Sequence, residues 1–144
     1  MTISIQGISI SRGIAIGKVH CIKHDQIDAP EYVIKKPQVN NEISRLDDAI
    51  KNARNELRAI RDHIPSSTSI NISEFINTHL LMLEDNALTE EPKRIIKDNL
   101  CNAEWALKLQ RDALVNVFDE MDDAYLSTRK DDVDHVVNRI LRIL

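Results

Sequence analysis

The residues of this sequence that could act as proton carriers, nucleophiles or metal ligands are few and widely spaced. The five histidines are His20, His24, His63, His79 and His135. Glu84 follows His79, but not at the three- or four-residue spacing that lets two ligands share one helical face. The aspartates just before His135 are typical of a solvated, acidic helix start. We therefore expect no metal site.

Other catalytic patterns are also missing from the sequence. Cys21 and Cys101 lie far apart without neighbouring ligands, which is typical of isolated thiols in a reducing compartment. Gly13 and Gly17 could approach a phosphate, but their spacing matches no phosphate-binding loop, and a turn between strands is the simpler interpretation. On motifs alone, the sequence predicts a non-catalytic domain without a cofactor.

Composition narrows the class of protein further. The chain has 144 residues, of which 42% are hydrophobic and 29% charged, which suits one folded domain. A formal net charge of −4 argues against a nucleic-acid-binding protein, which needs a basic surface. No apolar run reaches the roughly 18–20 residues that cross a bilayer, and the start does not resemble a secretory signal. We expect a cytoplasmic protein that binds neither nucleic acid nor membrane.

The elements that must position these side chains divide the chain into three parts. Residues 1–22 hold all three glycines and many β-branched residues, which predicts a short β segment. Residues 23–37 contain two prolines and mixed charges, and are predicted to be a linker. Residues 38–144 contain no glycine and only two prolines, which predicts a helical domain.

The helical part begins with a regular apolar seam. Apolar residues recur at alternating steps of four and three, at Val39, Ile43, Leu46, Ile50, Ala53, Leu57, Ile60 and Ile64. Further amphipathic helices are predicted over 70–84, 88–100, 103–121 and 122–144, with Asn102 as an N-cap. The fold class is therefore mainly α, an antiparallel four-helix bundle or a pair of helical hairpins. The seam could pack against the later helices or against a second chain.

Two surfaces could bind a partner. The segment 78–88 has more apolar residues than one core face needs, because Leu81, Met82 and Leu88 accompany the inward-facing set. Extra burial is the alternative explanation. Residues 119–134 hold seven acids against Arg129 and Lys130, which would steer a basic partner, and Tyr125 lies within this stretch.

In this order and spacing, these features resemble a known family. The motifs are GISISRGIAIGK at 7–18, HLLMLED at 79–85 and MDDAYLSTRKDDVDHVVNRILRIL at 121–144. They resemble the N-terminal, HPr-binding part of Enzyme I, the phosphoenolpyruvate-protein phosphotransferase of the bacterial phosphotransferase system. The segment EWALKLQRDAL at 104–114 is more similar to the nitrogen-related paralogue than to the sugar-system enzyme.

The resemblance implies which functions of such an enzyme this chain would carry and which would lie in other parts of the enzyme. Residues 1–22 would belong to an α/β phosphohistidine subdomain, whereas 38–144 would form the helical domain that docks the phosphocarrier HPr. The phosphorylated histidine and the barrel that binds phosphoenolpyruvate and Mg²⁺ would lie in sequence that this chain does not contain. The chain alone would not be catalytic, and the parent enzyme would dimerise through the absent C-terminal part.

The resemblance also implies which residues contact the carrier. They are His79, Leu81, Met82, Asp85 and Leu88 on one side, and Phe118, Tyr125 and Arg129 on the other. Asn86 and Ala87 stand where the family usually has acids, which favours a variant carrier or a weaker interface. Arg129 could face a phosphoryl group in transit or an acid on the carrier. The alternative function is a stand-alone helical bundle that dimerises through the seam of residues 39–64.

Overall fold

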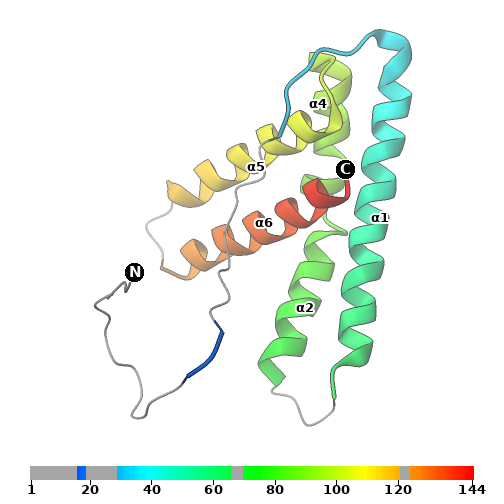
Figure 1. The fold of residues 1–144 in the computed structure, drawn as a ribbon. Helices are drawn as coiled ribbons and strands as arrows, with labels where there is room; N and C mark the ends of the chain where they lie inside the picture. Colours follow the sequence, from blue (N-terminus) through cyan, green and yellow to red (C-terminus); the bar gives the residue numbers. More distant parts are fainter. Residues whose placement is uncertain (1–15, 19–28, 66–69, 121–123) are drawn as a thin grey trace, which may run out of the picture.

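The helices form two antiparallel hairpins joined by a short helical connection. A computed structural model describes residues 16–18, 29–65, 70–120 and 124–144. After a 3-10 turn at Lys36–Gln38, the helices are α1 (Val39–His63), α2 (Ile70–Met82), α3 (Asn86–Thr89), α4 (Glu91–Asn99), α5 (Ala103–Asp119) and α6 (Ala124–Ile143). Figure 1 shows α2 running back along α1, and α6 running back along α5. The predicted mainly α fold with paired hairpins is confirmed.

The seam of α1 is filled by the other helices of the same chain. Leu46, Ala53 and Leu57 are buried, and α1 contacts α2, α4, α5 and α6. Ile60, in the last turn, departs from the prediction because its side chain is exposed. The helix gives way to extended backbone at Ile64, next to Pro65, because a residue before proline disfavours the helical conformation.

The predicted helix over 88–100 is divided into α3 and α4. Asp85 caps α3, because its carboxylate accepts a hydrogen bond from the Ala87 backbone N–H at 2.7 Å. Pro92 lies in the first turn of α4, where a missing N–H costs nothing. α4 ends at Leu100 with a left-handed backbone (φ 51°), a conformation that costs a non-glycine residue about 1–2 kcal/mol.

One continuous apolar core joins the two hairpins. Its fully buried members include Leu46 of α1, Ile96 of α4, Leu107 of α5 and Ile140 of α6, and α2 adds Leu80, which is 7% exposed. The free thiol of Cys101 also lies in this core. Among the described helices, none is both long enough and apolar enough to cross a membrane.

The predicted β segment, residues 1–22, lies outside the described residues except for 16–18. Those three residues belong to no helix or strand. The later part of the predicted linker is described from residue 29 and runs beside the loop between α4 and α5. Val33 and Cys101 form an isolated antiparallel β-bridge there.

Candidate functional site

A groove lies between α1, α2 and α6. Its volume is about 1190 Å³, and its apolar side includes Leu57, Phe75 and Ile76. Its polar side comes mainly from α6 and includes His135 and Arg139. α2 and α6 therefore meet across a space that is partly lined by ionisable side chains.

His79 is a buried polar residue that lines this groove. It lies on the inward face of α2 with only 3% of its surface exposed, and its ring packs on that of Phe75 at 4.1 Å between centroids. Its Nε2 lies 3.4 Å from Oδ1 of Asp132 on α6, a long hydrogen bond. Burial lowers the pKa of His79 below its ordinary value of 6.5, and the bond to Asp132 opposes that effect only in part.

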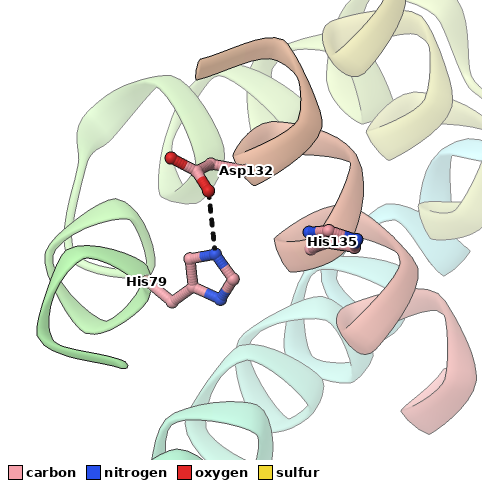
Figure 2. A group of neighbouring side chains, drawn as sticks. All are labelled: His79, Asp132 and His135. Carbon is pink, nitrogen blue, oxygen red and sulfur yellow. Dashed lines mark hydrogen bonds and ion pairs between the residues drawn. The ribbon is translucent and has the colours of Figure 1, made fainter. Parts of the chain in front are cut away.

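His135 lies beside this pair, one turn beyond Asp132 on α6. Its ring centroid is 6.2 Å from that of His79, and its ring meets Phe75 edge-on. Figure 2 shows the two histidines and the aspartate grouped across the α2–α6 contact. One ligand atom from each residue lies within 4.8 Å of the others.

The sequence prediction missed this group. It compared His79 only with residues on its own helix and took the aspartates before His135 as a solvated helix start. The signal that could have found it is the three-residue step from Asp132 to His135, which places both on one helical face. Only the packing of α6 on α2 adds His79 to them.

The three surplus apolar residues have different environments. Leu81 is 68% exposed, Met82 is half-buried and packs against the core, and Leu88 is 2% exposed within the core. Extra burial thus accounts for Leu88 and for part of Met82. Leu81 is the one that the fold presents to solvent.

The remaining predicted partner residues lie on α3, α5 and α6. Asp85 is exposed apart from its capping bond, and Phe118 is half-buried against the core at the end of α5. Nη1 of Arg129 lies 3.7 Å from Oδ2 of Asp132, so Arg129 is tied to the carboxylate that contacts His79. Tyr125 belongs to α6, but its side chain lies outside the described part of the chain.

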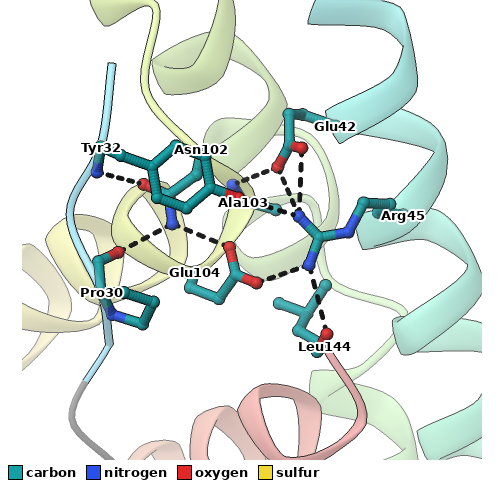
Figure 3. A network of polar contacts seen from close by, with 8 residues as sticks. All are labelled: Pro30, Tyr32, Glu42, Arg45, Asn102, Ala103, Glu104 and Leu144. Carbon is teal, nitrogen blue, oxygen red and sulfur yellow. Dashed lines mark hydrogen bonds and ion pairs between the residues drawn. The ribbon is translucent and has the colours of Figure 1, made fainter. Parts of the chain in front are cut away.

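A second polar cluster lies at the corner where the two hairpins join. Arg45 donates to Oε2 of Glu42 at 2.8 Å, to Oε1 of Glu104 at 2.6 Å and to the Leu144 carbonyl at 3.2 Å. Figure 3 shows that the cluster ties α1, the start of α5 and the end of α6 together. The hydrogen bond to Glu104 raises the pKa of Arg45 above its ordinary value, so this arginine stays charged.

Asn102 fills its predicted place before α5 but bonds differently from a usual N-cap. Its side chain makes no capping bond; it accepts from the Tyr32 N–H at 3.1 Å and donates to the Pro30 carbonyl at 2.7 Å. The free N–H of Ala103 donates instead to Glu42 of α1 at 2.9 Å. The cluster (Glu42, Arg45, Asn102 and Glu104, with the segment 30–32 that they hold) is called the polar corner below.

Comparisons with known proteins show which proteins this chain is similar to. Residues 6–129 match the family model described as "PEP-utilising enzyme, N-terminal". The phosphoenolpyruvate-protein phosphotransferase of Cupriavidus necator is 37% identical over 144 residues, covering 100% of this chain and 25% of the relative. That of Bacillus subtilis (strain 168) is 31% identical over 139 residues, covering 94% of this chain and 24% of the relative.

A solved structure supports the fold. The NMR solution structure of an Enzyme I protein (nEIt) aligns with a TM-score of 0.75 at 24% identity, over 83% of this chain and 48% of that chain. The chain spans about a quarter of the length of the curated relatives named above. The family model covers most of its residues, and the chain therefore belongs to the PEP-utilising enzyme N-terminal family.

Proposed function

We propose that this chain is the carrier-docking domain of a cytoplasmic phosphoenolpyruvate-protein phosphotransferase and binds an HPr-like phosphocarrier. The docking face consists of Leu81, Met82 and Asp85 near the end of α2, Phe118 at the end of α5, and Arg129 on α6. Tyr125 is assigned to it from sequence alone. The phosphoryl group, phosphoenolpyruvate and Mg²⁺ are handled by parts of the enzyme outside this chain, which also hold its dimer contact.

The exposure of Leu81 is the observation that carries the proposal. A leucine that is 68% exposed in the last turn of a helix gains nothing for the fold, and it is the most exposed of the large hydrophobic residues in the described helices. Burial of one leucine side chain in an interface is worth about 1.5–3 kcal/mol. Met82 beside it is flexible enough to adapt to a partner.

Charge supports a basic partner. Asp119 and Asp131 lie at the end of α5 and on α6 with exposed side chains, and Asp85 lies near the end of α2. Lys130 offsets one of these charges through its ion pair with Asp119 at 2.9 Å. Acidic groups at the rim of an interface mainly raise the rate of encounter and set orientation, whereas apolar anchors supply affinity.

The alternative, dimerisation through the seam of α1, finds no support. That seam is occupied by α2, α4, α5 and α6 of the same chain. Its central residues, such as Leu46 and Leu57, are buried and offer no apolar area to a second copy.

The test is a titration of the isotope-labelled chain with the HPr-type carriers of its own organism, one from the sugar branch and one from the nitrogen branch. A carrier that transfers phosphoryl groups must leave quickly, so we expect micromolar to millimolar affinity, roughly −4 to −8 kcal/mol. Signals from residues 79–88 and 118–131 should shift in fast exchange with one of the two carriers.

The variant Leu81→Asp should abolish those shifts, because it places a charge where the apolar anchor docks. Val33→Asp is the matched control: Val33 is also an exposed apolar residue (84%), but it lies beside the start of α5. Phe118 of the docking face lies at the other end of that helix, about 20 Å away. Unchanged binding by Leu81→Asp, or carrier-induced shifts confined to another surface, would refute the assignment.

A further inference from the structure

Two imidazoles and one carboxylate converge where α2 meets α6. His79 comes from α2, whereas Asp132 and His135 come from one face of α6, three residues apart. Nitrogen and oxygen ligands of this kind suit Zn²⁺, and a three-residue step on a helix is a usual way to supply two ligands. The proposed docking function uses neither His135 nor the Oδ1 atom of Asp132.

The geometry is close to that of a tetrahedral zinc site. With zinc–ligand distances of about 2.0–2.2 Å, neighbouring ligand atoms in such a site lie about 3.3–3.6 Å apart. Nε2 of His79 and Oδ1 of Asp132 are already 3.4 Å apart. His135 completes the set within 4.8 Å, and its ring is exposed and can rotate to close the remaining distance.

Among the described residues, His135 has ring contacts but no polar partner that would explain its place. No hydrogen bond or ion pair joins its ring to another residue in the described part of the chain, and its contacts are with the rings of Phe75 and His79. His79, by contrast, is held by burial and by Asp132. An unpartnered imidazole beside a buried imidazole–carboxylate pair is an available third ligand.

The surrounding charges permit a cation. Arg129 contacts Oδ2 of Asp132 at 3.7 Å, which leaves Oδ1 directed at His79. Arg139, which lines the groove together with His79, forms an ion pair with Glu56 at 3.2 Å. Asp131 adds an exposed negative charge next to the group.

We propose that His79, Asp132 and His135 bind one Zn²⁺ ion, with a fourth position open to solvent in the groove. A bound ion would replace the long hydrogen bond between His79 and Asp132 as a polar link between α2 and α6. Because Leu81 is two residues from His79 and Arg129 is three from Asp132, the ion would fix the two sides of the docking face relative to each other. The site itself does not depend on the docking function.

The test is a Zn²⁺ titration of the whole, metal-free chain, in which calorimetry measures binding and NMR monitors the signals of the histidine rings. We expect one ion per chain, with the ring signals of His79 and His135 shifting together. His135→Gln should weaken binding about 100-fold or more, since even an outer partner of a metal ligand is worth 10- to 100-fold. The side chain of His135 is exposed, so this variant should fold as the parent does, which circular dichroism verifies.

His63→Gln is the matched control, because His63 is another exposed histidine and lies at the far end of α1. His63→Gln should bind Zn²⁺ as the parent does. Zn²⁺ should raise the melting temperature of the parent and of His63→Gln, but not that of His135→Gln. The proposal is overturned if the parent binds no stoichiometric Zn²⁺, if His135→Gln binds as tightly as the parent, or if His63→Gln loses the binding.

Discussion

The polar corner and the α2–α6 groove both contain ionisable side chains, but those of the corner are fully hydrogen-bonded within the chain and those of the groove are not. At the corner, Arg45 serves two carboxylates and a backbone carbonyl, and Glu42 also accepts the first free N–H of α5. In the groove, His79 and Asp132 share one long bond, and His135 has no polar partner among the described residues. The polar side chains of the corner are therefore satisfied within the chain, whereas those of the groove can still bind a ligand.

This difference follows from what each region joins. The corner connects the segment 30–32 with α1, α5 and the end of α6, and these parts are distant in sequence. Polar groups buried at such a junction cost several kcal/mol unless each is paired, so full pairing is a condition for the fold. The groove lies between three helices, α1, α2 and α6, that already share the apolar core, and its polar groups can stay partly unpaired beside solvent.

The largest effect is expected at the corner, from Arg45→Ala. It leaves the carboxylates of Glu42 and Glu104, whose side chains are 8% and 11% exposed, without their cation. Breaking a buried ion pair from one side costs about 3–5 kcal/mol of unfolding free energy. Chemical denaturation measures the loss.

Arg139→Ala is the matched control for that experiment. The Arg139 side chain is as exposed as that of Arg45, at 33%, but its partner Glu56 is 55% exposed. An ion pair of this kind is worth less than about 1 kcal/mol. Equal losses for the two variants would contradict the distinction between corner and groove.

The next largest loss of unfolding free energy is expected from Leu57→Ala, at the apolar side of the groove. Leu57 is buried in the core, and its truncation should cost about 2–5 kcal/mol through lost transfer free energy and the cavity left behind. Denaturant unfolding monitored by circular dichroism measures this change. A loss under about half a kcal/mol would mean that the seam of α1 is not filled within the chain.

The sequence was sufficient for the helices whose pattern is local. The four–three steps from Val39 to Ile64 predict α1, and the absence of glycine with only two prolines after residue 38 disfavours a β fold for the rest. The division of 88–100 was not predicted, although Asp85 before a short apolar turn is a usual N-cap signal. Local pattern therefore predicts helices well and their short connections less well.

Contacts between distant segments were beyond the sequence pattern. Asn102 was expected to cap α5 with its own side chain, yet that side chain bonds Pro30 and Tyr32 while Glu42 supplies the cap. His79 and His135 meet only because α6 packs on α2. Both cases depend on tertiary packing, which the spacing of residues along one helix does not determine.

A smaller loss of stability is expected at the corner when the pH is lowered. Burial alone would raise the pKa of Glu104, but bonds from its backbone N–H, Arg45 and Asn102 lower the pKa below its usual 4.5. The folded state then binds fewer protons than the unfolded state below pH 4.5. This contribution to stability is present above that pH and is lost as the pH falls through the folded pKa.

Unfolding free energies measured between pH 7 and pH 3 should therefore fall less steeply for Glu104→Gln than for the parent. Glu84→Gln, on an exposed side chain, controls for the loss of one negative charge. A parent-like pH profile for Glu104→Gln would show that the corner does not hold this carboxylate in its charged form.

The smallest effect on folding is expected at the docking face, where Leu81→Asp should change the unfolding free energy by less than about 0.5 kcal/mol. Leu81 is exposed, so the aspartate loses little packing and stays hydrated. The adjacent Leu80 is the sharpest control, because it is buried in the core and Leu80→Asp would bury an unpaired carboxylate. Two neighbouring residues of one helix should thus differ by several kcal/mol under the same substitution. If Leu81→Asp destabilises the chain as Leu80→Asp does, Leu81 belongs to the core and is not available to a partner.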